Sequence, residues 1–346
     1  MNGGIDIENS RKTRISVVYN GKAVTQKLAA FLENFIYTDV ASGESDSIDI
    51  TLDNRDLRFM NQYMPKKGDK IKASICRYNW KKNGSTNSVR CGTFVLDDLS
   101  FQEPPLTCSI GAVSAPVKGE FKSAKRTKVY KDISIREIAK KIAGRAGISL
   151  VYDAPEIKIH KIEQSKAADS EFLSSICEEY GLGLKVYNGK IVIFDEEKYE
   201  RRSPSNTINR KSGTVISWSW NTTLQGTYTG AKVSYTDPDD QKRHHVIIGK
   251  AGRMLHVDVT AFSKKEAVIK AKAKLAAENK KRTTMTVTLT GDMIIYSATT
   301  IRVKGFGKLS GKYYVDKNEH QVSASGGYNQ MLTVHKVGTR ISTAVS

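Results

Sequence analysis

Residues 263–337 read SKKEAVIKAKAKLAAENKKRTTMTVTLTGDMIIYSATTIRVKGFGKLSGKYYVDKNEHQVSASGGYNQMLTVHKV, and this stretch decides the fold. Ser263 and Glu266 stand three residues apart before a helix-forming run, the pattern of a capping box at a helix start. Short runs of strand-like character follow the expected helix. They predict strands over 284–290, 293–296, 299–304, 312–316 and 329–336. The stretch contains no cluster of acid, base or metal-binding residues, so we interpret it as a β scaffold with one helix.

The first part of the chain also has a β pattern. A strand is expected over 14–19, and the Asn20-Gly21 pair after it favours a two-residue hairpin turn. Residues 47–52 alternate apolar and polar side chains, which is the period of a half-buried strand. Further strands are expected over 70–78, 90–97 and 106–113. We therefore expect a first β-barrel domain over residues 1–118.

The middle of the chain, residues 119–200, mixes helical and strand patterns and predicts a small α+β module. Ser134 and Glu137 form another capping-box pattern before a run with helical apolar spacing. A second helical face follows it. The Asn188-Gly189 pair separates two short apolar runs, which predicts a hairpin at the end of the module.

The remaining sequence gives the domain organisation. Residues 201–213 are polar and contain Pro204, so they are expected to form a linker or a long loop. Residues 214–346 are expected to form a second β-barrel domain with one helix. The predicted fold class is thus mainly β with α+β content, in which two β-barrel domains flank a small α+β module.

The charge of the chain is strongly basic. It has 55 lysine and arginine residues against 36 acidic residues, a net charge of +19. Basic residues gather in two runs, 121–146 and 264–282, which would attract polyanions or an acidic protein surface. The simpler interpretation is a solvated helix face for each run. A basic polyanion-binding module is therefore kept as an alternative function, although no zinc-finger or RNP-type motif accompanies the charge.

The chemistry-bearing residues do not predict a cofactor or a metal site. The four cysteines, Cys76, Cys91, Cys108 and Cys177, have no CxxC spacing. His244 and His245 are neighbours on a predicted strand and would point to opposite faces. His320 and His335 are expected to be strand-surface histidines that hydrogen-bond to a neighbour. We expect no cofactor and no bound metal.

The N-terminal residues MNGGIDIENSRKTR contain no apolar core of signal-peptide length. No stretch approaches the roughly 20 apolar residues that a membrane-spanning helix needs. The expectation is a chain made in the cytosol, without a cleavable signal and without membrane anchoring.

Two groups of residues carry a family resemblance. Residues 35–56, FIYTDVASGESDSIDITLDNRD, and PKKGDKI at 65–71 resemble the first barrel of hub proteins in the phage late-control protein D family. Residues 303–332, VKGFGKLSGKYYVDKNEHQVSASGGYNQML, resemble the last barrel of that family. The matching positions are Tyr37, Thr38, Asp39, Asp46, Pro65, Gly68, Asp69, Gly305, Gly307, Lys312, Tyr313, Tyr314, His320, Gly327 and Tyr328. The chain departs from the family where Phe59-Met60 replaces a tryptophan and Ser297-Ala298 replaces a glycine.

The resemblance implies a structural hub of a contractile tail baseplate, similar to the hub part of type VI secretion spike proteins. Hubs of this family are trimers in which six tail-tube-like β-barrels adapt a six-fold tail tube to a three-fold spike. The implied partners are two further copies of the chain, the spike protein, the tail tube protein or tube initiator, baseplate wedge proteins and the tape-measure protein. DNA would only pass through. The implied location is the baseplate of a virion or of a phage-tail-like particle such as an R-type bacteriocin, assembled in the cytoplasm of the bacterial host.

The expected site residues are interface residues, and we expect no enzymatic activity. They are Phe306, Tyr313, Tyr314, Tyr328, Tyr37 and Asp39. One of the two adjacent tyrosines, Tyr313 and Tyr314, is expected to face outward and to anchor a neighbouring subunit together with Phe306. The alternative is a tail-associated cell-wall hydrolase. It has little support, because the chain has no HExxH motif and the adjacent carboxylates Glu178 and Glu179 would not converge on a helix.

Overall fold

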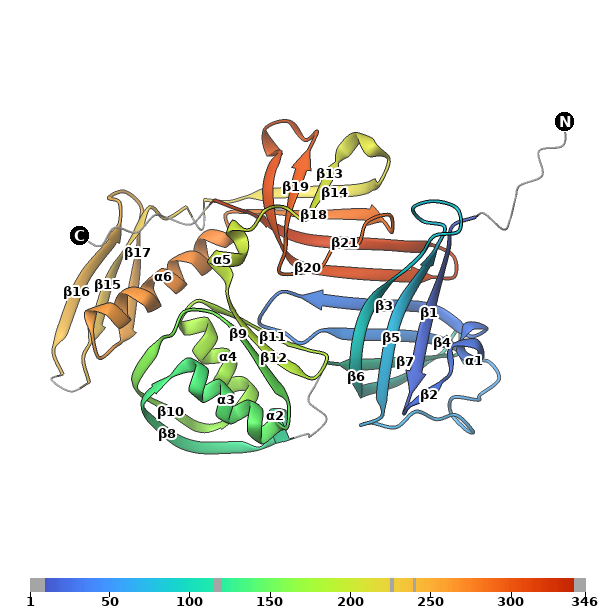
Figure 1. The fold of residues 1–346 in the computed structure, drawn as a ribbon, viewed down its shortest axis with the longest axis horizontal. Coiled ribbons are helices and arrows are strands. Elements are labelled where there is room, and N and C mark those ends of the chain that lie inside the picture. The colour runs from blue at the N-terminus through green and yellow to red at the C-terminus, as the bar shows by residue number, and fades with distance from the viewer. Residues whose placement is uncertain (1–9, 115–119, 225–226, 239–240, 339–346) are drawn as a thin grey trace.

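The computed structural model describes residues 10–114, 120–224, 227–238 and 241–338, and most of its regular structure is strand. Figure 1 shows a large sheet, a module in which helices pack on strands, and a small sheet covered by one long helix. The mainly β fold class with α+β content is therefore confirmed. None of the helices in the described part of the chain combines the length and apolar character that a membrane span requires.

The N-terminal β module contains most of the strands expected for it. It comprises β1 (Lys12–Tyr19), β2 (Lys22–Ala23), α1 (Thr25–Ala29), β3 (Leu32–Val40), β4 (Ser47–Asp53), β5 (Lys70–Tyr78), β6 (Thr86–Gln102) and β7 (Thr107–Val113). The alternation that predicted β4 places Ile48, Ile50 and Leu52 in the core. The sequence pattern did not single out β3, although this strand proves central to the fold.

The central module packs two helices on short sheets. It comprises α2 (Glu120–Ser123), β8 (Lys125–Ser134), α3 (Ile135–Ala146), β9 (Ser149–Asp153), β10 (Lys158–Ala168), α4 (Asp169–Glu179), β11 (Leu182–Tyr187), β12 (Lys190–Asp195) and α5 (Glu196–Arg201). The capping box at α3 is confirmed. The Ser134 hydroxyl accepts from the Glu137 amide at 3.2 Å, and the Glu137 carboxylate accepts from the Ser134 amide at 2.9 Å.

The C-terminal β module comprises β13 (Asn206–Asn209), β14 (Val215–Thr222), β18 (Thr283–Thr290), β19 (Thr300–Lys304), β20 (Gly311–Ser323) and β21 (Gly327–Lys336). The prediction of a linker over 201–213 is partly wrong, because β13 lies in this segment and pairs in parallel with β19 as part of the sheet. The strand predicted over 293–296 is also absent. Side-chain amides of Asn318 and Gln330 donate to the carbonyls of Ile295 and Met293 at 2.8 and 2.7 Å. These backbone carbonyls therefore have hydrogen-bond partners although the segment is a loop.

An insertion lies between β14 and β18 of this module. It comprises β15 (Gly230–Thr236), β16 (Arg243–Gly249), β17 (Met254–Thr260) and α6 (Lys264–Lys280). Its strands form a separate sheet in the order β16-β15-β17, and α6 covers one face of that sheet around a core of its own. The segment expected to be a single barrel with one helix therefore contains two separately cored units.

A single 13-stranded sheet joins the two β modules, with the main path β14-β18-β21-β20-β3-β4-β7-β6-β5-β1-β2. β20 pairs antiparallel with β3 from Lys317 opposite Val40 to Ser323 opposite Asn34. The path is open, so neither module closes into the expected barrel within the described residues. Two core clusters remain, one for each module, and the N-terminal cluster includes Val322 and Tyr328 from the C-terminal module.

Candidate functional site

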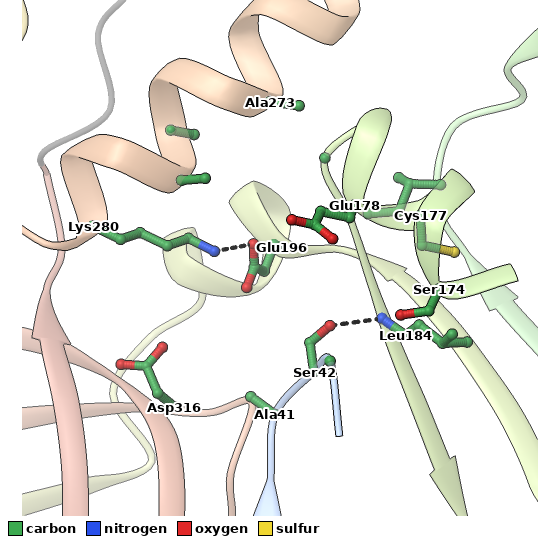
Figure 2. Close-up of a pocket in the computed structure, with 15 residues that line it drawn as sticks. Ala41, Ser42, Ser174, Cys177, Glu178, Leu184, Glu196, Ala273, Lys280 and Asp316 are labelled. Carbon is green, nitrogen blue, oxygen red and sulfur yellow. Dashed lines mark hydrogen bonds and ion pairs between the residues drawn. The ribbon is translucent and has the colours of Figure 1, made fainter. Parts of the chain in front are cut away.

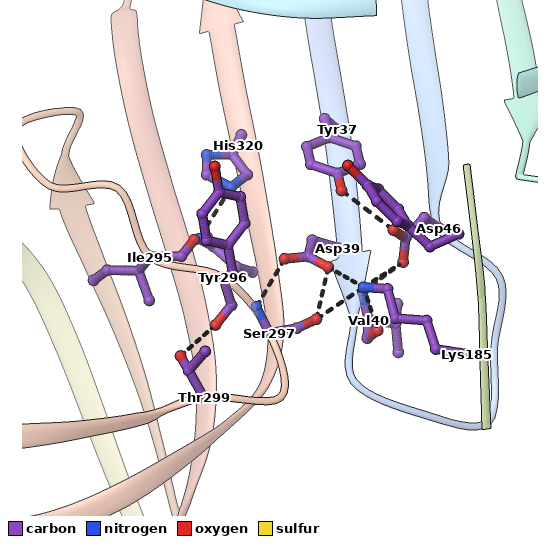
Figure 3. A network of polar contacts seen from close by, with 12 residues as sticks. Tyr37, Asp39, Val40, Asp46, Lys185, Ile295, Tyr296, Ser297, Thr299 and His320 are labelled. Carbon is purple, nitrogen blue, oxygen red and sulfur yellow. Dashed lines mark hydrogen bonds and ion pairs between the residues drawn. The ribbon is translucent and has the colours of Figure 1, made fainter. Parts of the chain in front are cut away.

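The three modules meet at a buried polar network around Lys185 on β11 (Figure 3). The Lys185 ammonium group contacts the Asp39 carboxylate at the end of β3 and lies 3.1 Å from the Asp46 carboxylate. It also donates to the Val40 carbonyl at 3.0 Å and to the Ser297 hydroxyl at 3.1 Å. Asp39, Lys185 and Ser297 belong to the N-terminal, central and C-terminal modules. This one cation therefore links all three.

Each carboxylate of the network has further donors. Asp39 accepts from the Ser297 amide at 2.7 Å and from the Ser297 hydroxyl at 2.6 Å. Asp46 accepts from the Val40 amide at 3.1 Å and from the Tyr37 hydroxyl at 3.2 Å. Saturating a buried carboxylate with hydrogen bonds offsets much of the free energy lost when it leaves water. Ser297 is thus one of the residues that bind Asp39.

The electrostatics of the network favour a structural role. Burial raises the pKa of Asp46 to about 6, against the opposing effect of Lys185. Burial alone would lower the pKa of Lys185, but Asp39 and Asp46 together raise it, so the ammonium form persists. The site contains two carboxyl groups and only one ammonium group, so it has fewer positive charges than acidic groups. Such a cluster holds chain segments together. The nearby cavity of about 280 Å³ is lined by Ala41 and Leu184, and Asp39, Asp46 and Lys185 are not part of its lining.

An aromatic column continues the site along β3, β20 and β21. The His320 ring stacks on Tyr37 at 5.5 Å between centroids and on Tyr328 at 6.0 Å. Nε2 of His320 lies 3.1 Å from the side-chain nitrogen of Asn318, and Nδ1 lies 2.8 Å from the Tyr328 hydroxyl. Burial lowers the pKa of His320 to about 4, so the ring is neutral at neutral pH. Residues from both ends of the chain build this column.

The six residues expected at an interface are all buried inside the chain. Tyr37, Asp39 and Tyr328 lie in the network and the column just described. The expectation that either Tyr313 or Tyr314 faces outward is wrong, because both are fully buried. Tyr313 belongs to the core of the C-terminal module, and the Tyr314 ring packs 5.2 Å from His335. Their contact with a neighbouring subunit remains a prediction.

Phe306 is almost fully buried in the C-terminal core, and its ring meets Trp218 edge-on at 5.2 Å. Trp218 on β14 is 39% exposed. The accessible aromatic at this end of the sheet is therefore Trp218 rather than Phe306. Alternation along a strand places Trp218 and Trp220 on one face, but it does not indicate which of the neighbouring aromatics remains at the surface.

His320 and His335 are buried, which corrects the expectation of two surface histidines. Nδ1 of His335 lies 2.8 Å from the Asp316 carboxylate, and Nε2 lies 3.5 Å from the Glu200 carboxylate. Burial alone would lower the pKa of His335, but Asp316 and Glu200 raise it to about 9. The protonated imidazole therefore connects α5 of the central module to β20 and β21.

A polar cavity of about 280 Å³ lies beside this junction, between α4, α6 and the turn after β3 (Figure 2). Its lining includes an ion pair between Lys280 and Glu196, and the Ser42 hydroxyl accepts from the Leu184 amide at 2.9 Å. Burial raises the pKa of the Cys177 thiol to about 12, which leaves it unreactive at neutral pH. No histidine lines the cavity among the described residues, so nothing here resembles a nucleophile with its base.

The histidine pair on β16 also has ordinary contacts. His245 lies 3.1 Å from the Ser234 hydroxyl, and the His244 ring stacks on Tyr235. Asp239 and Asp240, which shortly precede this pair in the sequence and could add carboxylate ligands to it, lie outside the described residues. Within the described part of the chain, no group of three or more histidine, cysteine, aspartate or glutamate side chains is arranged to hold a metal ion.

No protein-family model and no curated protein matches the sequence. Solved structures do match. The tail protein from Neisseria meningitidis MC58 aligns with a TM-score of 0.72 at 14% identity, over 95% of this chain and 98% of its own. The 43 kDa tail protein of prophage MuSo2 from Shewanella oneidensis aligns with a TM-score of 0.70 at 12% identity, over 94% of this chain and 99% of its own.

A component of a bacterial secretion system has the same fold. The E. coli c3393 protein of the type VI secretion system aligns with a TM-score of 0.56 at 10% identity, over 95% of this chain and 78% of its own. The chain thus has the fold of phage tail proteins. The same architecture occurs in the type VI secretion component.

Proposed function

We propose that this chain is a structural component of a phage tail or a related injection particle, and that it is the trimeric hub joining a six-fold tube to a three-fold spike. The observation that carries the proposal is the β3–β20 ladder, which places two β modules side by side in one sheet. Three chains with two modules each supply six modules around one axis. A ring of this kind satisfies both symmetries with one polypeptide.

The free edges of the sheet support contacts between copies. β14 pairs only with β18, and residues 97–102 of β6 pair only with β7 among the described strands. β14 contains no charged residue and exposes Ile216 and Trp218, so it lacks the usual protection of an edge strand. Joining the β14 edge of one copy to the β6 edge of the next would pair both of these edges around a closed ring, whereas β2 and β13 would remain as outer edges.

The central part of the sheet face opposite the two cores runs from β14 across β18, β21, β20, β3, β4 and β7 to residues 98–100 of β6. It has a distinctive composition, and we assign it to the lumen of this ring. Exposed basic residues such as Lys70, Lys72 and Arg302 lie on the same face but outside this central part. We call the central part the open face. Its accessible members, placed by the strand registers, are Ser217, Ser219, Thr286, Thr288, Thr290, Thr333, Met331, Asn329, Lys317, Glu319, Gln321, Ser323, Asn34, Ile36, Thr38, Ser47, Asp49, Thr51, Ser109, Gly111, Val113, Asp98 and Ser100.

Hydroxyl and amide groups dominate the open face, and its acidic groups outnumber its basic ones although the chain carries +19. Lys317, its single basic member, pairs with Glu319 at 3.0 Å. Burial raises the pKa of Asp49, and the nearby Asp98 and Glu319 raise it further. A surface of this kind would not retain a polyanion. DNA would therefore pass as transient cargo, while the basic runs would face protein partners.

The proposal includes the partners that such a hub requires. These are the spike protein, the tail tube protein or tube initiator, wedge proteins and the tape-measure protein, in a baseplate assembled in the host cytoplasm. One more solved structure with this fold belongs to a Francisella PdpA–VgrG complex, with a TM-score of 0.56 over 94% of this chain and 58% of that one. The fold therefore occurs in a protein that is assembled with others.

Multi-angle light scattering of the purified chain, alone and co-expressed with its spike, tests the proposal. Three copies per particle are expected, and the double variant Ile216→Lys, Trp218→Asp is expected to remain monomeric with an unchanged circular dichroism spectrum. Met331→Lys, on the open face away from the edge, is the matched control and should still assemble. A complex with one copy of this chain per spike chain, each an isolated pair, contradicts the hub proposal.

A further inference from the structure

The loop between β4 and β5 carries an unusual concentration of exposed apolar side chains. Leu57, Met60, Tyr63 and Met64 are 46%, 42%, 50% and 51% exposed, and we call them the 57–64 patch. Single exposed apolar residues are common on protein surfaces, but a cluster of large ones in one short loop marks an interaction site. Methionine adapts its shape to a partner more readily than other apolar residues do.

A cavity lies directly under this patch. It has a volume of about 590 Å³ and lies between the loop, α1 and the core face of the sheet. Its walls include Val17, Leu28, Phe31 and Ile71, and the half-exposed Tyr63 and Met64 belong to both the cavity wall and the patch. A side chain that enters between these two residues would reach an apolar space of ligand size.

The loop is held in place before any partner arrives. At its start, the Asn54 side chain accepts from the Phe59 amide at 2.9 Å, and the Arg58 guanidinium lies 3.8 Å from the centre of the Phe31 ring. At its end, Asp69 accepts from the Asn20 side chain at 2.8 Å and from the Tyr19 hydroxyl. A loop fixed at both ends loses little conformational entropy on binding.

The charges around the patch identify the kind of partner. Lys22, Lys27, Lys66 and Lys67 are exposed at its margin, and none of them forms an ion pair with a carboxylate of the described residues. We call them the lysine rim. The nearby acidic groups are already engaged, since Asp53 pairs with Arg55 and Asp56 with Arg58. Asp69 accepts from Tyr19 and Asn20 and offsets part of the charge of Lys66, so the four lysines keep an excess of positive charge. An apolar centre within a basic rim is complementary to an acidic amphipathic segment.

We propose that the 57–64 patch and its cavity bind a segment of another protein that combines large apolar anchors with flanking carboxylates. A second copy of this chain fits less well, because it carries +19 and would meet the lysine rim with like charge. A membrane surface also fits less well, because a planar lipid layer would not fill the cavity. The inference does not depend on the hub proposal, since the site lies within one chain.

Two synthetic helical peptides test this site on the full chain by fluorescence anisotropy. Both have leucine at positions i, i+3, i+4 and i+7, and their polar positions are all glutamate in one and all lysine in the other. The acidic peptide should bind about tenfold more tightly than the basic one. The double variant Met60→Ser, Met64→Ser should weaken its binding about tenfold, whereas Met331→Ser, an exposed methionine elsewhere, should not.

A separate pair of substitutions tests the contribution of the lysine rim to binding. The double variant Lys66→Gln, Lys67→Gln should weaken the acidic peptide severalfold and reduce the dependence of its affinity on salt. All substituted residues are exposed, so thermal melting should confirm that each variant folds as the parent does.

Three results would overturn the proposal. The first is equal affinity for the two peptides, or affinity that is unchanged in both double variants. The second is co-sedimentation with phosphatidylcholine–phosphatidylserine vesicles that is lost with Met60→Ser, Met64→Ser, since this would assign the patch to a membrane. The third is a change in copy number in the same variant by analytical ultracentrifugation, since this would assign the patch to a second copy.

Discussion

At the scale of single residues, the junction of the modules depends on Lys185. Within the described part of the chain, it is the one cation that contacts both Asp39 and Asp46, whose side chains are 3% and 0% exposed, while Lys185 itself is 14% exposed. Two carboxylates can remain buried together only while a positive charge and hydrogen-bond donors surround them. The identity of this one side chain therefore controls whether three modules that are far apart in sequence stay together.

Replacing Lys185 should be strongly destabilising. We expect Lys185→Met to lower the free energy of unfolding by about 3–5 kcal/mol, because it leaves two carboxylates buried without a counter-charge. Urea denaturation followed by circular dichroism measures the loss. Lys190→Met, an exposed lysine at the start of β12, is the control and should change the free energy by less than about 0.5 kcal/mol. Equal effects of the two variants would show that the network does not hold the junction.

Asp46 should give the protein a pH-dependent stability. Its folded-state pKa, about 6, lies above the ordinary 3.8 of an aspartate. The folded state therefore binds more protons than the unfolded state between these values, and stability is expected to fall by about 1–3 kcal/mol as pH rises from 4 to 6. Asp46→Asn should flatten this interval in denaturation curves recorded at successive pH values. An unchanged slope in the variant would contradict the raised pKa.

His335 should contribute in a higher pH range. Its folded-state pKa of about 9 lies above the ordinary 6.5, so its stabilisation is complete below pH 6.5 and is lost as pH rises through 9. His335→Gln should remove about 2–3 kcal/mol of pH dependence between these limits. His256→Gln, exposed on β17, is the matched control and should retain the parent slope. The same slope in all three proteins would disprove the role of the Glu200–His335–Asp316 contact.

The sequence could identify several of these residues but not their environment. Tyr37, Asp39 and Tyr328 were singled out by family resemblance, and the structure brings them together around His320 and Lys185. Lys185 itself lay in an ordinary strand pattern, and its two carboxylate partners are distant in sequence. No local pattern encodes such a contact. Burial of both Tyr313 and Tyr314 on β20 also could not be read from alternation, because the Tyr314 ring packs on His335 of the neighbouring strand, which in turn contacts Glu200 of α5.

At the scale of secondary-structure elements, the sequence predicted features that depend on residues close together in the chain, such as the starts of helices. The capping boxes placed the starts of α3 and α6, although the Glu266 carboxylate at α6 accepts from the Phe262 amide at 3.0 Å and not from Ser263. β8 and β10 were missed, because their strands are mostly polar and exposed and show little alternation. β20 extends to Ser323, and its second half escaped prediction because Asn318 and His320 are polar residues in a core.

The contact between α4 and α6 depends on a glycine. Gly181 has φ +71°, and a Cβ added there would lie 3.1 Å from the Cβ of Ala273. Next to it, the Tyr180 hydroxyl donates to the Glu266 carboxylate at 2.6 Å, and Lys270 lies 3.0 Å from both Glu179 and Glu266. This close approach holds the insertion against the central module.

A pair of glycine substitutions separates crowding from backbone strain. Gly181→Ala and Gly189→Ala each place a side chain at positive φ, but nothing lies within 4 Å of the added Cβ at Gly189. Both variants should lose about 1–2 kcal/mol from strain, and Gly181→Ala should lose about 1 kcal/mol more through overpacking. Hydrogen exchange in α6 should rise only in Gly181→Ala. Equal exchange in the two variants would mean that α6 does not need this contact.

At the scale of the whole molecule, the two β modules share one sheet and are mutually dependent. The sequence suggested two separate barrels, because each end of the chain has its own strand pattern and turn signals. The ladder between β3 and β20 is a long-range pairing, and composition and periodicity do not specify which strands become neighbours. The inserted sheet with α6 was missed for the same reason, since its strands resemble those of the module that contains it.

A fragment with residues 10–114 tests this dependence. We expect it to lack a cooperative thermal transition, because it loses the β20 ladder and the contacts of Val322 and Tyr328 with the N-terminal core. A fragment with residues 120–201, whose core is largely its own, is the comparison and should melt cooperatively. Circular dichroism and proton NMR dispersion report both. A well-folded 10–114 fragment would show that the β modules are independent domains.

The β3–β20 ladder also determines when the protein can finish folding. During synthesis, the backbone groups along one side of β3 leave the ribosome long before residue 317 is made. At about 5–20 residues per second, roughly 15–60 s pass in between. For that time the nascent chain displays an unpaired, partly apolar strand to every other chain in the cell. Production of this protein should therefore depend on chaperones that bind emerging polypeptides, and slowing translation upstream of β20 should send more of it into inclusion bodies.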